Sequence, residues 1–491
     1  MEIEPTLCYK AVQSRDARFD GRFFTAVLTT GVYCRPVCPA VTPRPENVRF
    51  YPSAAAAQEA GFRPCLRCRP EASPGTPEWQ EAASLVTRGL RLISEGMLDE
   101  AGVDGLAGSL NIGARHLRRL FARNLGAPPI AVAQTRRLDF ARRLIDETSL
   151  PVTEIAFSAG FSSLRRFNDA FLRTYGRPPS EMRRLRTSAG ESTKSSSLVL
   201  KLFYRPPFDW AELSRFLRDR AIPGVELVNE AYYRRTVRVR ESVGVIEVRP
   251  VLAERHVLLL VPAQFSKDLL AITDRVRDLL DLRSDPLTIG EHLSSDPWLS
   301  PLVNAKPGLR VPGAWDGFEI AVRAILGQQV SVKAASTMSG RLVQAFGEQL
   351  PLANDEHLTY LFPTPVQLSE ADFSKIGLTR QRARSIQVLA RAVEDGELTF
   401  NTGANLEGAI ERLTALPGIG AWTAHYIAMR ALREPDAFPA GDLGLRRAIS
   451  ADGKIAWSEK DLVERSQAWR PWRAYAAMHL WNRYGALSNK L

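Results

Sequence analysis

Leu416-Pro-Gly-Ile-Gly-Ala-Trp-Thr-Ala424 is the stretch that decides the fold of the C-terminal part of this chain, and Asp442 follows it after one helix-length segment. A proline and two glycines between apolar segments predict two helices joined by a tight hairpin. Because glycine allows close approach and positive φ, the backbone N–H groups of such a hairpin can bind a DNA phosphate. We therefore expect Leu416, Gly418 and Gly420 to contact DNA, with Asp442 as the candidate catalytic acid.

The charge of the chain is unevenly distributed. The net charge is +11, yet residues 101–190 alone hold 15 Lys and Arg against 7 Asp and Glu. A basic segment of this size is typical of a nucleic-acid-binding surface. The apolar content of 45% is ordinary for a globular protein, no apolar run is long enough to span a membrane, and the N-terminus has no secretory signal. We expect a cytoplasmic bacterial protein without a membrane partner, associated with the nucleoid when it binds DNA.

A repeat with a period of fifty residues marks this basic segment. Each copy reads as a short helix, a turn and an Arg-rich second helix, so two tandem helix-turn-helix units are predicted. The alternative is a helical bundle whose arginines form a solvated face. The repeated residues are Phe121, Arg123, Gly126, Pro128 and Pro129, which recur as Phe171, Arg173, Gly176, Pro178 and Pro179. The candidates for contacts in the major groove are Arg115, His116, Arg118 and Arg119 in the first unit, and Ser162, Ser163, Arg165, Arg166 and Asn168 in the second.

All five cysteines lie in the first 68 residues, and four of them form two close pairs, Cys34 with Cys38 and Cys65 with Cys68. Without a secretory signal, metal binding is favoured over disulfides. Four thiolates at this spacing suit tetrahedral Zn²⁺, which would also stabilise a segment whose core is too small to fold unaided. Cys8 has no close partner in sequence, and we expect it to be a small buried residue.

The sequence around the cysteines resembles the N-terminal domain of Ada-type alkylation-response proteins. The resemblance implies that Cys34 is a zinc-bound thiolate that irreversibly takes a methyl group from a DNA methylphosphotriester, with Cys38, Cys65 and Cys68 as its co-ligands. Loss of the negative charge on Cys34 would weaken its repulsion from DNA. A purely structural zinc site is the alternative. The likeness rests on Gly31-Val-Tyr-Cys-Arg-Pro-Val-Cys38, Glu46-Asn-Val-Arg-Phe-Tyr51 and Ala60-Gly-Phe-Arg-Pro-Cys-Leu-Arg-Cys68.

The repeated segment resembles the AraC-type regulator domain, chiefly over Ala156-Phe-Ser-Ala-Gly-Phe-Ser-Ser163. This resemblance implies sequence-specific binding to promoter DNA. If the chain is an activator, RNA polymerase is its expected protein partner. Two units on one chain can read adjacent turns of the major groove without a second copy, so we expect a monomer.

From about residue 198 to 485, the chain resembles AlkA-type 3-methyladenine DNA glycosylases of the helix-hairpin-helix superfamily. The resemblance implies that Asp442 stabilises the cationic sugar and aligns or deprotonates water. It also implies that Trp422, Tyr426 and Trp481 form a pocket that stacks on an electron-poor alkylated purine, flipped out of the duplex. The motifs that carry it are Ala321-Val-Arg-Ala-Ile-Leu-Gly-Gln-Gln-Val-Ser331, Leu416–Ala424, Phe438–Gly444 and Arg470-Pro-Trp-Arg-Ala-Tyr475.

Each of these residues also has a plainer interpretation. Asp442 precedes Leu-Gly-Leu-Arg-Arg and suits the N-cap of a helix, a role that is compatible with catalysis. Trp422 and Tyr426, four residues apart on one helix, are by spacing more often core residues. Gln329 matches the family position that fills the gap left by the flipped base, but it is polar where an apolar wedge is expected. The alternative is that Gln329 is a polar residue at a helix end.

A missing lysine and missing cysteines restrict the reactions that this chain is expected to catalyse. Lyase-competent relatives carry a lysine where this chain has Trp422, so the resemblance implies hydrolysis without strand cleavage. No cysteine follows Cys68. This excludes the iron–sulfur cluster of some relatives, and also the cysteine-dependent guanine methyltransferase domain that often follows Ada-type segments.

The predicted fold is multidomain α+β, in four parts. We expect strands over 235–240, 245–249 and 256–261 and a helix over 266–282, with flexible linkers at 73–77 and 187–197. The parts are a small zinc-stapled α/β domain over 1–75, an all-α tandem helix-turn-helix domain over 79–186, an α+β domain with an antiparallel sheet over 198–310, and an all-α helix-hairpin-helix glycosylase domain over 311–491.

The implied function is repair of alkylated double-stranded DNA and response to the damage. A glycosylase that lacks lyase activity is joined to a methylphosphotriester sensor and a transcription regulator. The competing hypothesis is an alkylation-responsive transcription factor whose C-terminal half binds DNA without excising bases.

Overall fold

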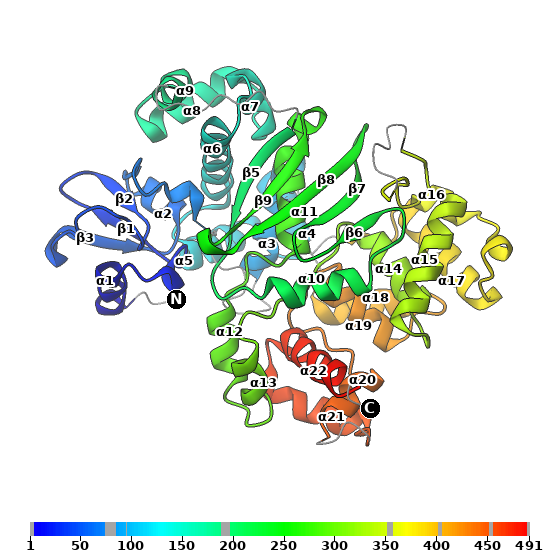
Figure 1. The fold of residues 1–491 in the computed structure, drawn as a ribbon. Helices are drawn as coiled ribbons and strands as arrows, with labels where there is room; N and C mark the ends of the chain where they lie inside the picture. Colours follow the sequence, from blue (N-terminus) through cyan, green and yellow to red (C-terminus); the bar gives the residue numbers. More distant parts are fainter. Residues whose placement is uncertain are drawn as a thin grey trace.

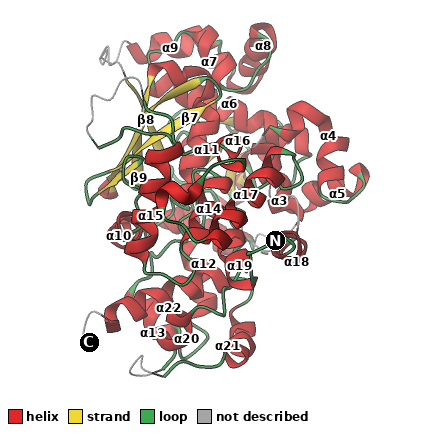
Figure 2. Cartoon of the chain, turned by 90° about the vertical axis from the view of Figure 1, so that its right-hand side faces the viewer, coloured by secondary structure: helices red, strands yellow, loops and turns green. Residues whose placement is uncertain are grey.

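The computed structural model describes residues 4–73, 85–94, 96–187, 197–350, 357–400, 405–450 and 455–488. The linkers expected at 73–77 and 187–197 lie almost entirely outside these ranges. Figure 1 shows the parts in chain order, from the blue N-terminal sheet through the green central sheet to the orange and red C-terminal helices. Helices dominate the described part of the chain (Figure 2), and the named strands form two separate sheets. The expected multidomain α+β fold is confirmed.

The N-terminal sheet has the strand order β3-β1-β2-β4. β1 (Phe24–Val27) pairs antiparallel with β2 (Val32–Cys34) and β3 (Val48–Tyr51), and β2 pairs in parallel with β4 (Arg63–Pro64). Each of the two apolar clusters here contains only four buried residues, so a further staple is needed for stability. The helices are α1 (Pro5–Ser14) and α2 (Ala54–Glu59), with 3-10 turns at Ala17–Phe19, Pro45–Asn47 and Pro70–Ala72.

The basic segment folds into the two predicted helix-turn-helix units. In each unit the second helix ends at a glycine in the left-handed region, Gly126 with φ of +70° and Gly176 with φ of +69°. Phe121 and Phe171, one turn before these glycines, are both fully buried, so the sequence repeat is also a repeat of structure. The helices are α3 (Leu85–Ser94), α4 (Met97–Ser109), α5 (Ala114–Leu125), α6 (Pro129–Glu147), α7 (Val152–Ser158), α8 (Leu164–Tyr175) and α9 (Pro179–Thr187).

The central sheet is antiparallel throughout, in the order β5-β9-β8-β7-β6. The strands expected over 245–249 and 256–261 fall within β8 and β9, whereas the one expected over 235–240 corresponds to β7, which ends one residue earlier at Val239. The helix expected over 266–282 begins as a 3-10 turn over Ala263–Asp268 and becomes α-helical only at Leu269, a common form of helix N-terminus. The strands are β5 (Ser197–Phe203), β6 (Glu226–Val228), β7 (Tyr233–Val239), β8 (Ser242–Val251) and β9 (His256–Pro262). The helices are α10 (Trp210–Asp219), α11 (Leu269–Leu279), α12 (Pro286–Leu293) and α13 (Ser300–Ala305), with a 3-10 turn at Leu252–Glu254.

The C-terminal part is helical, as expected. α10 lies between the central sheet and these helices (Figure 1), and its Phe216 belongs to their buried cluster. The helices are α14 (Gly317–Leu326), α15 (Val332–Phe346), α16 (Pro365–Ser369), α17 (Arg380–Glu394), α18 (Leu406–Thr414), α19 (Ala421–Arg430), α20 (Leu443–Ala448), α21 (Glu459–Arg465) and α22 (Arg473–Ser488), with 3-10 turns at Phe373–Ile376 and Ser466–Trp469.

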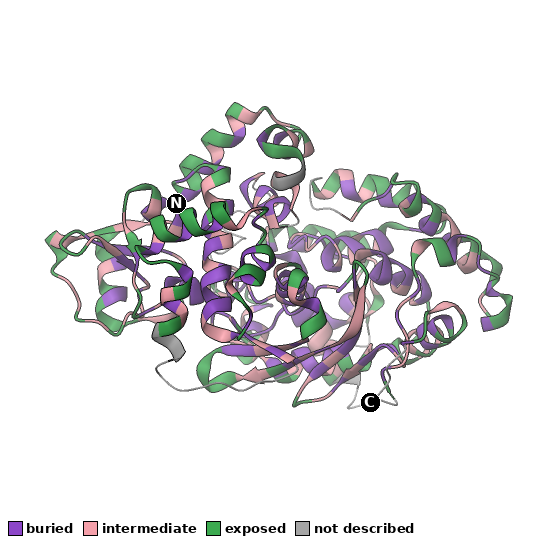
Figure 3. Ribbon diagram, turned by 90° about the horizontal axis from the view of Figure 1, so that it is seen from above, coloured by how far each residue is buried: buried purple, intermediate pink, exposed green. Residues whose placement is uncertain are grey.

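The parts share buried surfaces, and the buried residues gather along the middle of the molecule (Figure 3). One apolar cluster runs from Leu138 in α6, through α7 and α8, to the central sheet and Trp315. Arg91 of α3 is fully buried and donates hydrogen bonds to the carbonyl oxygens of Leu432 (2.7 Å) and Arg433 (2.9 Å), directly after α19. None of the described helices combines the length and the apolarity needed to cross a membrane.

Candidate functional site

The predicted hairpin joins α18 to α19, and its two glycines differ in what they require. Gly418 has φ of +84°, and a Cβ there would lie 1.9 Å from Oγ of Ser385, so the fold itself needs glycine. Gly420 has φ of −87°, is exposed, and a Cβ there would meet nothing within 4 Å. Gly420 is also the N-cap of α19, and no side chain caps that helix. The open space and the uncapped N–H groups suit a phosphate. Leu416 is half-buried beside them.

Asp442 is the N-cap of α20 and meets side chains from two further helices. Its Oδ1 accepts hydrogen bonds from the backbone N–H of Leu445 and from Nε1 of Trp481, both at 3.0 Å. Its Oδ2 accepts a hydrogen bond from Nε1 of Trp422, also at 3.0 Å. The helix cap considered in the sequence analysis is therefore present, and two indoles hold the same carboxylate. Because Asp442 is only half-buried, the group is fixed in orientation yet remains accessible.

The three candidate aromatic residues lie against one another. Trp422 and Tyr426 stack on α19 with ring centroids 5.5 Å apart and an interplanar angle of 12°. Trp481 of α22 meets Tyr426 edge-on, with centroids 6.3 Å apart. All three are half-buried, and together with Asp442 they line one open pocket. They therefore form the wall of a pocket, where aromatic faces suit stacking on an electron-poor ring.

The loop between α14 and α15 carries two glutamines in different surroundings. Nε2 of Gln328 donates to the carbonyl oxygen of Gly418 (2.8 Å) and to Oγ1 of Thr423 (3.0 Å), which ties the loop to the hairpin. Gln329 lines the pocket, is exposed, and has φ of +56°. Residues other than glycine rarely adopt this left-handed backbone conformation. Gln328 therefore has a structural role in holding the loop against the hairpin, whereas the side chain of Gln329 is exposed at the pocket.

Two arginines that the sequence analysis did not identify surround the hydroxyl of Tyr426. Nη1 of Arg430 donates to this hydroxyl at 2.9 Å, and Arg220, at the end of α10, lines the pocket. Burial raises the pKa of Tyr426, but the charges of Arg430 and Arg220 outweigh burial and lower the pKa to about 8. The spacing of four residues between Tyr426 and Arg430 on one helix is a signal in the sequence. Arg220 comes from a distant segment, and no local pattern indicates it.

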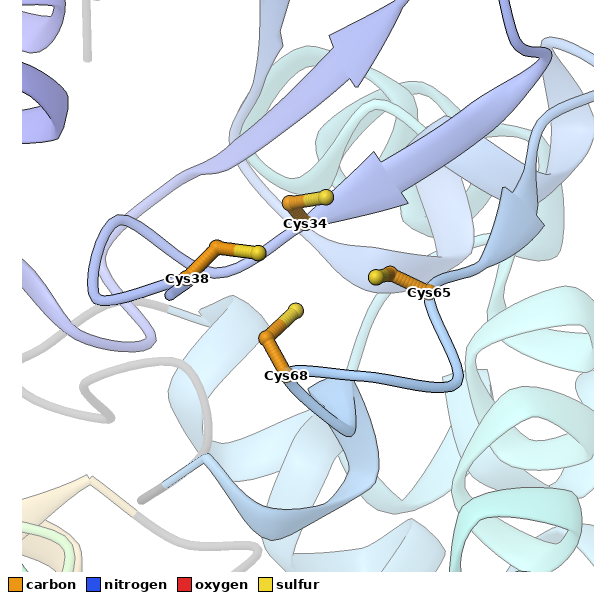
Figure 4. Close-up of side chains that lie close together, drawn as sticks. All are labelled: Cys34, Cys38, Cys65 and Cys68. Atoms are coloured by element: carbon orange, nitrogen blue, oxygen red, sulfur yellow. The ribbon is translucent and has the colours of Figure 1, made fainter. Parts of the chain in front are cut away.

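The four cysteines come together as expected (Figure 4). Cys34 ends β2, Cys38 lies in the following loop, and Cys65 and Cys68 lie in the turn after β4. Their sulfur atoms all lie within 4.8 Å of one another and point toward a common centre. Tetrahedral Zn²⁺ with Zn–S bonds of about 2.3 Å places its sulfur ligands about 3.8 Å apart, so this donor set fits a zinc site. Cys8 is buried in a separate apolar cluster, as expected.

The four sulfur ligands differ in accessibility. Cys34 and Cys68 are 8% and 7% exposed, whereas Cys38 and Cys65 are half-buried. The backbone N–H of Arg35 donates to Sγ of Cys68 at 3.4 Å. The hydrogen bond with Cys34 lowers the pKa of Cys38 to about 7. Hydrogen bonds with the other three thiols raise the pKa of Cys34 instead, so the sulfurs share protons among themselves, and a bound Zn²⁺ would hold them as thiolates.

The candidate groove-reading residues lie on α5 and α8 or in the turn before α8. All of them are exposed or half-buried, while each helix turns its apolar face inward on Leu117 and Phe121 or on Phe167 and Phe171. The exposed members are Arg115, Arg118, Arg119, Ser162, Arg165, Arg166 and Asn168, and the half-buried members are His116 and Ser163.

Comparison with known proteins covers nearly the whole chain. Over 478 residues, which are 96% of this chain and 95% of the relative, it is 46% identical to the probable bifunctional transcriptional activator/DNA repair enzyme AlkA of Mycobacterium tuberculosis. This chain belongs to that family.

Four family models match successive parts of this AlkA-family chain. A DNA repair module and a transcription-regulator module therefore share one polypeptide, and the four thiols lie in a zinc-binding module. The models are the metal binding domain of Ada over 7–71, a helix-turn-helix domain over 106–185, the AlkA N-terminal domain over 199–316, and the HhH-GPD superfamily base excision DNA repair protein over 322–474.

Other relatives resemble only one half of this AlkA-family chain. It is 34% identical over 284 residues to DNA-3-methyladenine glycosylase 2 of Escherichia coli, covering 57% of this chain and 95% of the relative. It is 37% identical over 155 residues to the bifunctional transcriptional activator/DNA repair enzyme Ada of Escherichia coli, covering 31% of this chain and 42% of the relative. A solved 3-methyladenine DNA glycosylase from Archaeoglobus fulgidus shares the fold, with a TM-score of 0.52 and 23% identity over 59% of this chain and 99% of that one.

Proposed function

We propose that this AlkA-family chain is a monofunctional DNA glycosylase that hydrolyses the N-glycosidic bond of alkylated purines, of the 3-methyladenine type, in double-stranded DNA. One observation supports this most directly. Both oxygens of Asp442 accept hydrogen bonds from indole N–H groups at 3.0 Å, and Asp442 shares one open pocket with those indoles.

The proposed mechanism needs a flipped-out nucleotide with its base against Trp422, Tyr426 and Trp481. As the C–N bond breaks, its electron pair leaves with the base and positive charge develops on the sugar. The Asp442 carboxylate stabilises this charge, orients the attacking water and accepts the water proton. Because the indoles hold the carboxylate before the reaction, little reorganisation is required in the transition state.

The reaction is proposed to stop at an intact abasic site. Trp422 stands where lyase-competent relatives carry a lysine, and it cannot form a Schiff base. Lys333, in the first turn of α15, is the only lysine among the described residues that line the pocket. Borohydride reduction during turnover should trap no protein–DNA adduct. An adduct on Lys333 would contradict the monofunctional assignment.

Gln329 is proposed to occupy the gap that the flipped nucleotide leaves in the duplex. Its exposed side chain and its positive φ at the pocket support this role, and its amide can replace hydrogen bonds of the orphaned base. The uncapped start of α19, with Leu416, Gly418 and Gly420 before it, is proposed to hold a DNA phosphate.

The decisive experiment is base release from duplexes with single alkylated purines. Asp442→Asn keeps an N-cap residue but removes the charge. We expect it to lower the single-turnover rate at least about 100-fold, within the range of general acid–base contributions, and to retain DNA binding. Asp461→Asn, an exposed acid in the first turn of α21, is the matched control. A wild-type protein that releases no base from any duplex would instead support a transcription factor whose C-terminal half only binds DNA.

A second proposed activity is methyl transfer to Cys34 from a DNA methylphosphotriester. Bound Zn²⁺, held by Cys34, Cys38, Cys65 and Cys68, would keep the sulfurs anionic. The sulfur of Cys34 attacks the methyl carbon, the carbon–oxygen bond breaks with its electrons on the phosphate oxygen, and a stable S-methyl group remains. Peptide mass spectrometry after incubation with methylphosphotriester DNA should find the methyl group on Cys34. A methyl group on Cys38 or Cys65, or none at all, overturns the assignment.

The helix-turn-helix residues on α5 and α8 are proposed to read promoter DNA in the major groove. Their exposure and the local excess of basic side chains support this role. We further propose that the chain acts as a monomer and contacts RNA polymerase as an activator. Sedimentation of the protein with and without promoter DNA tests the monomer directly.

A further inference from the structure

Arg220 is a charged side chain that reaches the aromatic pocket from the sheet-bearing segment. It is the residue that follows α10, and it lines the same pocket as Trp422 and Tyr426. Its guanidinium lies over the ring of Phe216, 3.8 Å from the ring centroid. Nη1 of Arg220 also donates to the carbonyl oxygen of Phe216, at a long distance of 3.4 Å. The ring therefore fixes the plane of the guanidinium while engaging few of its donors.

The neighbouring arginines are paired much more fully than Arg220. Arg323 lies within 3.2 Å of carboxylate oxygens of both Glu226 and Glu319. Arg430 donates to two backbone carbonyl oxygens, at 2.9 and 2.8 Å, and to the Tyr426 hydroxyl. Within the described ranges, no carboxylate lies at salt-bridge distance from Arg220. An arginine has five N–H donors, so Arg220 retains donors for a molecule in the pocket.

The cost of leaving these donors unpaired gives Arg220 a preference among bases. Arg220 is half-buried in the open pocket, and once a flipped base shields its donors from water, any donor left without an acceptor carries a desolvation cost that is larger for a charged group. A base that presents an acceptor removes this cost, and a base that presents an amino group in the same place does not. Sites with such donors discriminate strongly between otherwise similar substrates.

We propose that Arg220 reads the flipped base by donating hydrogen bonds to an acceptor on its edge, and that it favours purines with a carbonyl oxygen at position 6 over purines with an amino group there. The inference rests on the proposed glycosylase function and deepens it. Phe216 keeps the guanidinium plane in place, and the Tyr426 hydroxyl beside it accepts a hydrogen bond from Arg430. Arg220 is thus a specificity-determining residue, while Asp442 performs the chemistry.

Duplex DNA methylated at random offers a matched pair of substrates. Both 7-methylguanine and 3-methyladenine are cationic while attached to the sugar, but the first carries a carbonyl oxygen at position 6 and the second an amino group. Chromatography measures the release of both bases from one sample. We expect Arg220→Met to lower the ratio of 7-methylguanine to 3-methyladenine release at least about 10-fold, the effect of losing one charged hydrogen bond of about 1.5 kcal/mol. A ratio that stays unchanged overturns the inference.

A duplex with a single hypoxanthine, which is neutral and has the same carbonyl oxygen, separates hydrogen bonding from charge. We expect its release by Arg220→Met to fall together with that of 7-methylguanine; if it stays unchanged, the inference fails. Arg220→Lys keeps the positive charge but lacks the planar guanidinium, so it should give an intermediate release ratio. If the Met variant does not fold, the Lys variant provides the same test. Arg218→Met, exposed on the same helix, is the control. A wild-type protein that releases no base at all refutes the glycosylase proposal, whereas an unchanged ratio refutes only the role of Arg220.

Discussion

The four cysteines of the zinc centre lie between Cys34 and Cys68, whereas the pocket that contains Asp442 is lined by residues of α10, α19, α20 and α22, between Phe216 and Trp481. In the zinc centre, close sequence spacing brings the ligands together, and the metal fixes their geometry. In the carboxylate centre, contacts between side chains and backbone groups join the parts. Its geometry depends on the packing of helices that are far apart in the sequence and on two indole hydrogen bonds.

The two centres differ in the source of their stability. The N-terminal sheet has only small apolar clusters, and binding of zinc is part of the free energy of folding in such segments. The helices around Asp442 bury a large apolar cluster that includes Trp469, Tyr475 and Leu445. The first centre should therefore fail when its metal is removed, and the second when its hydrogen bonds are removed.

The largest expected effect is on the zinc centre. Cys38→Ser removes one of four ligands and should abolish stable zinc binding and unfold the segment over 4–73, since structural zinc contributes on the order of 10 kcal/mol. Base release should stay within about 2-fold of wild type, because no residue of this segment contacts Asp442. Cys8→Ser, outside the cluster, is the control. Atomic absorption measures the loss of zinc, and limited proteolysis measures the unfolding of the segment. If base release fell in parallel, the two centres would not be independent of each other.

Trp422→Phe should have the next largest effect. Among the described residues, the Trp422 indole is the only group that donates to Oδ2 of Asp442, and the phenylalanine removes this hydrogen bond while an aromatic face remains for stacking. A hydrogen bond to a charged group is worth about 1.5–3 kcal/mol, so kcat/KM for an alkylated duplex should fall about 10–100-fold. Trp298→Phe, on the surface, should leave the rate unchanged. An unaltered rate in Trp422→Phe would show that the indole is not needed to hold the carboxylate.

Trp481→Phe should reduce kcat/KM less than Trp422→Phe does. The oxygen that it releases, Oδ1, keeps the hydrogen bond from the backbone N–H of Leu445. We expect a loss of about 10-fold or less, at the low end for a charged hydrogen bond. The same steady-state assay ranks the two variants. The opposite order would contradict the distribution of hydrogen bonds around Asp442.

The smallest expected effect concerns Tyr426 and pH. The charges of Arg430 and Arg220 outweigh burial and lower the pKa of Tyr426 to about 8 from its ordinary value of 10. The folded protein therefore favours the phenolate, so this contribution to stability is absent below pH 8 and grows as the pH rises from about 8 towards 10. Near-ultraviolet titration should show one tyrosine ionising near pH 8. The signal should vanish in Tyr426→Phe and persist in Tyr232→Phe. A signal that persists in Tyr426→Phe belongs to another tyrosine.

Several features were predictable because they depend on neighbours in sequence. Gly126 and Gly176 end their helices in the same way because both copies of the repeat need a left-handed residue there. The two Cys pairs brought their sulfurs together because each pair lies on one short turn. The stacking of Trp422 on Tyr426 follows from their spacing on α19.

Other features could not be predicted from local patterns. Arg220 reaches the pocket only because α10 packs against α19 and α22, and Arg91 reaches the end of α19 only because α3 packs there. The difference between Gln328, tied to the hairpin, and Gln329, exposed with positive φ, also depends on the tertiary position of the loop.

The sequence by itself determined the kinds of chemistry in this chain: four thiols spaced for zinc, a repeated basic helix-turn-helix, and a hairpin followed by one acid. These depend on contacts within one turn or one helix, whose geometry the backbone fixes. Only the tertiary structure decided which side chains face Asp442, that both of its oxygens are held by indoles, and that an arginine from another segment lines the pocket. Those contacts join residues far apart in the chain, and they form only when the apolar faces of separate helices are buried together.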